Sequence, residues 1–556
     1  MIALLNIPAY AWKTLVILSC IAAMVMYAET MLIPAIPDLI RDFQVSYGMS
    51  SWILSSYLIS GAVMTPIAGK LSDVYGKKKM LLIIMIIYGV GVSAAGFSNS
   101  IIFMLVARAI QGIGLSMFPI AFSIVREQFP RQRIAIGQGI ISSMFAAGSS
   151  IGLYVGGNII QHFGWHATFF TIIPILIILL FTIWRFITIK KDNEYYKIQQ
   201  QSQQRQRHQQ EEEKVTKIQE EAEEKEANGS SKKYLIGENS ESIKSIAQID
   251  VKGAATLAAS IISFLLILTY SSQTDNSIND INLATMNINA NNNNINGANH
   301  TTHNSAISLE QVLILLAIGV ISFIAFIIIE KRAKYPLIDF RLLLSKAILP
   351  ANLIIMIFGI SMFTIFQTIA ILTRTPTPIG FGGNAITAGN VQLPFALILL
   401  IFGSTSGFLI SKFGSIKPIL TGSIVMVVGF SVLSLLHSSE IAVSVNLAIV
   451  SAGMSLINVG AMNVVTLATP RQSIGISLGM NMLIRIIGSS IGPAIAGMYM
   501  QMYQSTISIH GLIQHFPSAS SFDLIFITST ILSIGSLMLA LILRHRITKI
   551  KIPNLY

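Results

Sequence analysis

The sequence predicts an all-α membrane protein in which two six-helix bundles flank two extra central helices, making fourteen spans. Three observations predict this fold: fourteen long apolar runs, a charged fraction of only 11%, and an internal duplication. Soluble proteins average about 25% charged residues, so this chain has too few charges to cover a surface in water. Most of its surface is therefore expected to face lipid.

Each apolar run is long enough to cross a bilayer as a helix, which takes about 20 residues. The spans are predicted near residues 14–37, 49–69, 79–98, 100–125, 135–160, 168–189, 253–271, 310–330, 347–373, 385–411, 416–437, 440–466, 474–500 and 523–544. The resulting domains are a bundle at 1–189, a charged, Gln-rich linker at 190–252, two additional spans at 253–330 with an Asn-rich loop at 272–308, a second bundle at 331–546 and a tail at 547–556.

Loop charges predict the orientation of the chain. One set of loops carries lysines and arginines at 77–79, 126–133, 185–191, 331–334 and 544–551, whereas the opposite loops offer only Arg41 and Arg374. Because the number of spans is even, both termini are expected in the cytoplasm. We expect a monomeric, multi-pass protein of the cell membrane, with the lipid bilayer as its main partner.

Composition also excludes several functional classes. The net charge of +12 does not indicate nucleic-acid binding, because the basic residues lie at the ends of apolar runs and form no separate patch. A single cysteine, Cys20, excludes a disulfide framework and a Cys-based zinc site. The chain has no nucleophile constellation, phosphate loop or metal-ligand spacing, so we expect no enzyme activity, metal or cofactor.

The two long segments between spans are polar. Of 25 acidic residues, 13 lie at 190–252, where the mixed charges of 211–227 favour a solvated helix. This segment is either a plain linker or a regulatory or oligomerising element. The Asn-rich loop is expected outside the membrane, and Asn299 lies in a glycosylation acceptor pattern that a chance match explains equally well.

The duplication relates the two bundles at an offset of about 340 residues. The pattern Gly-Ser-Ser-Ile-Gly at 148–152 recurs at 488–492, and the Pro-Arg-Gln that begins at Pro130 recurs at Pro470. Two copies separated by an even number of spans share one orientation, and parallel repeats of this kind place a substrate site between them near the midplane. Two bundles that shared only helix packing would not also preserve matching loops.

The loop between spans 2 and 3 reads G-x-L-x-D-x-x-G-K-K, with Gly69, Asp73, Gly76, Lys77 and Lys78 at its defining positions. It resembles the corresponding loop of the major facilitator superfamily. The resemblance implies the major facilitator fold, and a loop that takes part in the conformational change. The alternative is a plain hairpin with positive-inside lysines.

Span 4 carries Arg108, Gln111, Gly112 and Gly114 in the order R-x-x-Q-G-x-G. This order resembles a superfamily element that is associated with proton coupling. An arginine in hydrocarbon is costly and should face a partner or a wet cavity. The alternative is an arginine that is held by backbone carbonyls and only fixes helix packing.

Span 5 carries Gly148, Gly152, Gly156 and Gly157, which resemble an antiporter motif of the same superfamily, with Leu153 in place of its proline. Glycine at every fourth position also permits close packing of membrane helices. Specialised antiport and ordinary packing are therefore both open.

Glu29 is the one acidic residue that we place deep in a span, and that first span resembles those of multidrug exporters. Glu29 and Arg108 are both expected in the outer half of the membrane, so they can pair if their spans line one cavity. A substrate that disturbs the pair would change the protonation of Glu29, which is a minimal device for proton coupling. The alternative is a structural ion pair.

Further polar residues inside spans are candidates for a substrate cavity, although interhelical hydrogen bonds explain each of them as well. Arg485 in span 13 resembles an arginine of the fourteen-span drug/proton antiporters. The other candidates are Tyr57, Gln367, Asn390, Gln392, Asn458 and Asn463.

The resemblance to the fourteen-span drug/proton antiporter type implies a secondary active transporter. It would export small amphipathic or cationic organic compounds by alternating access, driven by the proton gradient. Two alternatives remain: proton-coupled transport of one metabolite, and a membrane sensor with residues 190–252 as its output.

Overall fold

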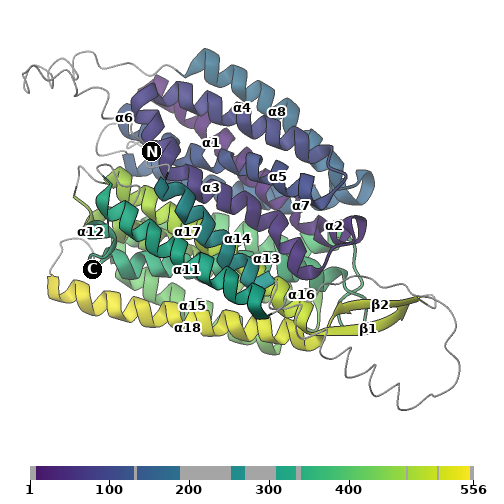
Figure 1. The fold of residues 1–556 in the computed structure, drawn as a ribbon. Coiled ribbons are helices and arrows are strands. Elements are labelled where there is room, and N and C mark those ends of the chain that lie inside the picture. The colour runs from purple at the N-terminus through teal and green to yellow at the C-terminus, as the bar shows by residue number, and fades with distance from the viewer. Residues whose placement is uncertain are drawn as a thin grey trace, which may run out of the picture. The chain divides into compact units, whose positions relative to one another are not determined.

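The structure, a computed structural model, describes residues 8–129, 134–187, 252–269, 309–333, 340–470, 474–509 and 512–550. The predictions for the linker, the Asn-rich loop with Asn299, and the tail lie outside the described residues. The fold is almost wholly helical, and fourteen helices in the described part are long and apolar enough to cross a membrane. The predicted all-α, fourteen-span architecture is confirmed (Figure 1).

The first bundle contains six spans, two of which are extended by short segments. Its elements are α1 (Ala9–Thr30) with η2 (Ile33–Ala35) and α2 (Ile36–Phe43), α3 (Tyr47–Tyr75), α4 (Lys77–Gly96), α5 (Ile101–Gly112) with η3 (Ile113–Ser116) and α6 (Met117–Gln128), α7 (Ile134–Phe163) and α8 (Trp165–Phe186).

The second bundle contains the other six spans and a strand pair that the sequence analysis did not predict. Two additional spans precede it, a helix at Lys252–Thr269 and α11 (Leu309–Arg332). The second bundle then comprises α12 (Phe340–Leu343), α13 (Ile348–Arg374), α14 (Ala385–Phe413), α15 (Ile416–Leu435), α16 (Glu440–Ala468), α17 (Ile474–Met502), the antiparallel strands β1 (Gln504–Ile509) and β2 (Leu512–Pro517), and α18 (Ala519–Ile550).

The two ends of the helix bundle are easily distinguished. Helix α1 begins and α18 ends on one side, which we call the terminal end, and α2 and the strands β1 and β2 lie on the other, the hairpin end (Figure 1). Four helices that begin at the hairpin end have side-chain caps, from Ser46, Ser100, Asn384 and Ser439. Such caps bind backbone N–H groups that a helix cannot satisfy itself.

The duplication is visible in side-chain contacts as well as in sequence. In the first bundle, Thr30 Oγ1 on α1 donates to the carbonyl of Ser149 on α7 at 3.2 Å. In the second bundle, Thr364 Oγ1 on α13 donates to the carbonyl of Gly492 on α17, also at 3.2 Å. In both halves a threonine of the first helix thus bonds to the backbone of the fifth, although the acceptors differ by three positions in the repeat, because Ser149 corresponds to Ser489.

The two additional spans pack against each other and against the first bundle. Ser260 Oγ donates to the carbonyl of Gly319 on α11 at 3.2 Å, and Trp52 Nε1 on α3 donates to Thr269 Oγ1 at 2.8 Å. Many apolar side chains of α11 are exposed, including Leu313 and Ile321. An apolar helix surface of this kind suits contact with lipid.

Candidate functional site

Glu29 lies at the end of α1, one residue before the helix terminates, and is buried. Its Oε2 atom has no hydrogen-bond partner among the described residues. A buried carboxyl group that lacks a partner is costly in a static protein. Such a group is expected where a proton or a ligand supplies the missing interaction during function.

Arg108 lies on α5 and is fully buried. Its Nε atom donates to the carbonyl of Ile53 at 3.1 Å, and its Nη1 atom donates to Gln111 Oε1 at 2.9 Å and to the carbonyl of Ala28 at 3.4 Å. The guanidinium also lies 4.5 Å from the ring centroid of Tyr57. These contacts hold Arg108 and link α1, α3 and α5. Among the described residues, Arg108 makes no direct bond to Glu29.

The glycines that follow Arg108 allow close packing at a break between α5 and α6. A Cβ atom at Gly112 would collide with the backbone of Tyr57 on α3, and one at Gly114 would collide with the ring of Tyr88 on α4. The R-x-x-Q-G-x-G element thus brings α3 and α4 against α5, which keeps Arg108 within reach of α1.

Arg485 comes from the second bundle, on α17, and is 9% exposed. Its guanidinium carbon lies 4.4 Å from the ring centroid of Phe145 on α7 and 5.8 Å from that of Phe358 on α13. Its Nε atom has no hydrogen-bond partner among the described residues. The charges of Arg485 and Arg108 both act on Glu29. One carboxyl group therefore interacts with an arginine from each half.

The remaining cavity candidates divide into two groups. Gln367 and Gln392 are fully buried, and both have side-chain atoms without a partner in the described part of the chain. By contrast, Asn463 donates to Ser415 Oγ at 2.7 Å within the second bundle, Asn390 is exposed, and Asn458 is half-buried. Within the described residues, no group of three or more His, Cys, Asp or Glu side chains is placed to hold a metal ion.

The glycines of span 5 face two different partners. Cβ atoms at Gly148 and Gly152 would meet α1, and the one at Gly156 would lie 2.6 Å from the carbonyl oxygen of Met31, which directly follows α1. Gly157 instead faces the second half, where its Cβ would lie 2.6 Å from the carbonyl oxygen of Ala385 on α14. The motif therefore packs helices inside one half and also contributes to the contact between the halves.

The loop between α3 and α4 has the turn that its glycines imply. Gly76 adopts φ +94°, a conformation that favours glycine. Lys77 forms an ion pair with Glu127 on α6, and Lys78 Nζ donates to the carbonyl of Trp184 on α8 at 2.7 Å. The nearest atom to a Cβ at Gly69 is 4.0 Å away, on Pro119, and the Asp73 side chain lies outside the described residues.

The two halves are in direct contact toward the hairpin end. The backbone N–H of Tyr47 on α3 donates to Gln501 Oε1 on α17 at 3.1 Å, and Ser55 Oγ donates to the carbonyl of Ser490 at 2.8 Å. Near the terminal end, in contrast, Cβ atoms at Gly139 and Gly479 would meet no atom within 4 Å. Among the described residues, these contacts between the halves thus lie toward the hairpin end.

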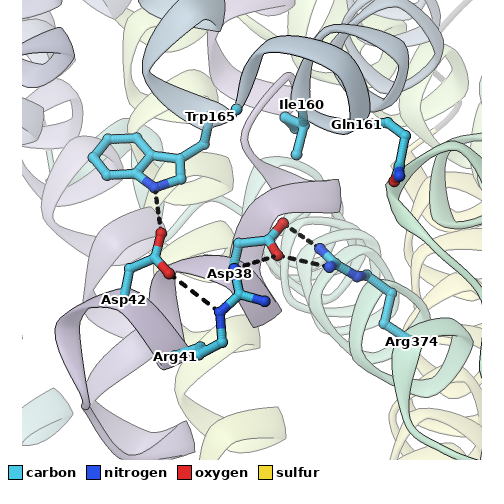
Figure 2. Close-up of a pocket in the computed structure, with 8 residues that line it drawn as sticks. Asp38, Arg41, Asp42, Ile160, Gln161, Trp165 and Arg374 are labelled. Carbon is cyan, nitrogen blue, oxygen red and sulfur yellow. Dashed lines mark hydrogen bonds and ion pairs between the residues drawn. The ribbon is translucent and has the colours of Figure 1, made fainter.

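A cluster of charged residues, which the sequence analysis did not predict, joins the halves at the hairpin end (Figure 2). Arg374, the last residue of α13, makes a two-pronged ion pair with Asp38 on α2; its Nη2 atom lies 2.7 Å from Asp38 Oδ1. Arg41 lies 3.4 Å from Asp38 and 3.2 Å from Asp42, which accepts from Trp165 Nε1 at 3.0 Å. These side chains line a cavity of about 310 Å³.

Comparison with known proteins places the chain among membrane transporters. The family model described as Major Facilitator Superfamily matches residues 18–493. The multidrug transporter protein MdtP of Bacillus subtilis (strain 168) is 24% identical over 92% of this chain and 80% of its own length. The uncharacterized MFS-type transporter YvkA of the same organism is 26% identical over 88% of this chain and 90% of its own length.

A solved structure is similar over nearly the whole chain. The human organic anion transporter MFSD10 has a TM-score of 0.55 at 13% identity, with 96% of this chain and 100% of that chain covered. At this level of identity the similarity supports the shared fold alone. Together with the fourteen spans and the duplicated packing, it agrees with a fold of two related bundles.

Proposed function

Because the chain belongs to the major facilitator superfamily and is a membrane transporter, we propose that it exports small amphipathic or cationic organic compounds in exchange for protons. Several relatives are named as multidrug transporters or efflux pumps. Besides MdtP, the multidrug efflux pump LfrA of Mycolicibacterium smegmatis is 33% identical over 31% of this chain and 35% of its own length.

The observation that carries the proposal is the environment of Glu29. It is the buried carboxyl group on which arginines from both halves act, and its Oε2 atom lacks a partner among the described residues. The protonation of such a group depends on how far apart the two halves are, because their positive charges act on it. It also depends on whether a cation lies between the halves.

In the proposed cycle, Glu29 carries a proton when the central site is free of substrate and releases it when a cationic substrate binds nearby. Arg108 stays fixed to the carbonyls of Ile53 and Ala28 and keeps a positive charge close to Glu29. Arg485 moves with the second half, so its effect on Glu29 changes as the bundles rock. Alternating access then follows from closure at the hairpin end and at the terminal end in turn.

The loop charges support an orientation in which the terminal end faces the cytoplasm and the hairpin end faces outward. In this orientation the Asp38–Arg374 pair joins the two halves on the outer side. We place the protein in the cell membrane as a monomer, since each chain contains both halves of the site.

The test is transport in proteoliposomes with an imposed pH gradient. Glu29→Gln is expected to abolish accumulation of ethidium against its concentration gradient, while exchange of labelled for unlabelled ethidium continues. Glu440→Gln serves as the control, because Glu440 is an exposed acid at the start of α16. If Glu29→Gln accumulates substrate as the wild type does, Glu29 does not couple transport to protons.

A further inference from the structure

Phe145 is the centre of a layered contact between the halves. Phe118 on α6 stacks on Phe145 with a centroid separation of 4.1 Å and an angle of 21° between the ring planes. The guanidinium carbon of Arg485 lies 4.4 Å from the Phe145 centroid. Phe145 is itself half-buried, whereas Phe118 is fully buried behind it. The ring is thus a supported aromatic surface with a cation upon it.

Arg485 is bound on that surface in the way that a ligand would be bound. It belongs to α17 of the second half, whereas Phe145 and Phe118 belong to the first. Its Nε atom has no hydrogen-bond acceptor among the described residues. Arg108, in contrast, donates three hydrogen bonds to α1, α3 and Gln111. Both arginines lie over aromatic rings and each has one nitrogen without a partner among the described residues, but only Arg108 is also held by these hydrogen bonds.

We propose that the guanidinium of Arg485 occupies the subsite on Phe145 in which the cationic part of a substrate binds, and that substrate enters by displacing it. The ligand class is a planar organic monocation with delocalised charge. A guanidinium is such a group, since it is flat and weakly hydrated and stacks on aromatic rings. The inference rests on the proposed function and adds the site and shape of the cation to it.

Displacement would also have a consequence for the carboxyl group nearby. Arg485 is one of the two arginines whose charges act on Glu29. A substrate cation on Phe145 adds its own positive charge to the site, which favours release of the proton from Glu29. The Arg485–Phe145 contact between the halves is lost at the same time. Substrate binding would therefore release one cross-half contact that holds the present arrangement.

The experiment is equilibrium binding of ethidium to the purified protein in lipid nanodiscs, with no proton gradient. Arg485→Met removes the internal competitor and is expected to tighten ethidium binding by about 2- to 30-fold, the factor that corresponds to a cation–π contact. Phe145→Leu is expected to weaken binding by a similar factor. In the double variant, binding should match that of Phe145→Leu alone, because the gain requires the vacated ring.

Arg185→Met is the matched control, because the Arg185 guanidinium lies 5.7 Å from the Phe186 centroid at an exposed position on α8. It should leave binding unchanged. The inference is overturned if Arg485→Met weakens ethidium binding, or if neither wild type nor Arg485→Met binds it. It is also overturned if Arg485→Met tightens ethidium binding in the Phe145→Leu variant as well. The tighter binding would then come only from the removal of a positive charge and not from the vacated ring.

A second variant and a second readout keep the result interpretable. Where Arg485→Met lowers the melting temperature of the purified protein, Arg485→Gln is measured with the same expectations. Proton-driven efflux is measured separately in proteoliposomes. If the Arg485 variants bind ethidium as the wild type does and the wild type shows proton-driven efflux, the subsite is refuted and the proposed function is not. If the binding changes occur as expected but the wild type shows no proton-driven efflux, the proposed function is refuted and the subsite is not.

Discussion

The ion pair between Asp38 and Arg374 offers a direct way to change the balance between the conformations. It is the two-pronged contact across the hairpin end, and Arg374 Nη1 also donates to the carbonyl of Pro34 at 3.1 Å. Arg374→Met keeps an unbranched apolar stem but removes these bonds. We expect this substitution to favour separation of the halves at the hairpin end.

The size of the shift follows from burial and geometry. The Arg374 and Asp38 side chains are only 16% and 13% exposed, so the pair is worth more than a surface ion pair and about 1–2 kcal/mol after partial solvent screening. Asp38 keeps a second, longer contact to Arg41 at 3.4 Å, which limits the loss. The ratio of closed to open molecules should therefore fall by about 5- to 30-fold.

The assay is electron–electron distance measurement between spin labels at Phe163 and Ser438, exposed positions near the hairpin end of each half, in a Cys20→Ser background. Arg374→Met should add a population with longer distances. Arg41→Met is the control, because Arg41 is 73% exposed and its ion pairs stay within one half. Identical distance distributions for wild type and Arg374→Met would refute the reasoning.

Three further predictions concern packing and turnover. Gly156→Val should lower the melting temperature by about 3 °C or more, because its Cβ would lie 2.6 Å from a backbone carbonyl oxygen, whereas Gly139→Ala, with no atom within 4 Å, should leave it unchanged. Thr30→Val and Thr364→Val each remove one interhelical bond of 3.2 Å and should each lower the melting temperature; no change in either variant would show that its bond does not stabilise the helix pair. Asp73→Asn should slow transport turnover more than it weakens substrate binding, and a pure loss of affinity would contradict this.

The helices were predictable from the sequence because hydrocarbon leaves the backbone little choice. All fourteen apolar runs form helices within a few residues of the predicted bounds. The duplication also extends to packing, since Gly152 and Gly492 occupy equivalent interfaces, although the sequence did not indicate their partner helices. The strands β1 and β2 were missed, because a polar segment between two spans carries no signal strong enough to distinguish a hairpin from a loop.

The site was less predictable, because helix rotation decides which polar residues meet. Asn390 and Gln392 lie two positions apart on α14, yet the first is exposed and the second is buried. The Asp38–Arg374 pair joins residues from different halves, and no local pattern indicates it. The contact of Arg485 with Phe145 depends likewise on how two separate bundles dock.

The central claim is that substrate and protons cross in opposite directions through a site between the halves. The most direct measurement follows both movements together in one proteoliposome preparation, with ethidium fluorescence for substrate and a pH-sensitive dye sealed inside for protons. The account predicts that ethidium entering down its gradient drives protons out of the vesicle interior, and that Glu29→Gln abolishes this proton movement while ethidium still enters. Ethidium entry through the wild type without any change of internal pH would contradict it.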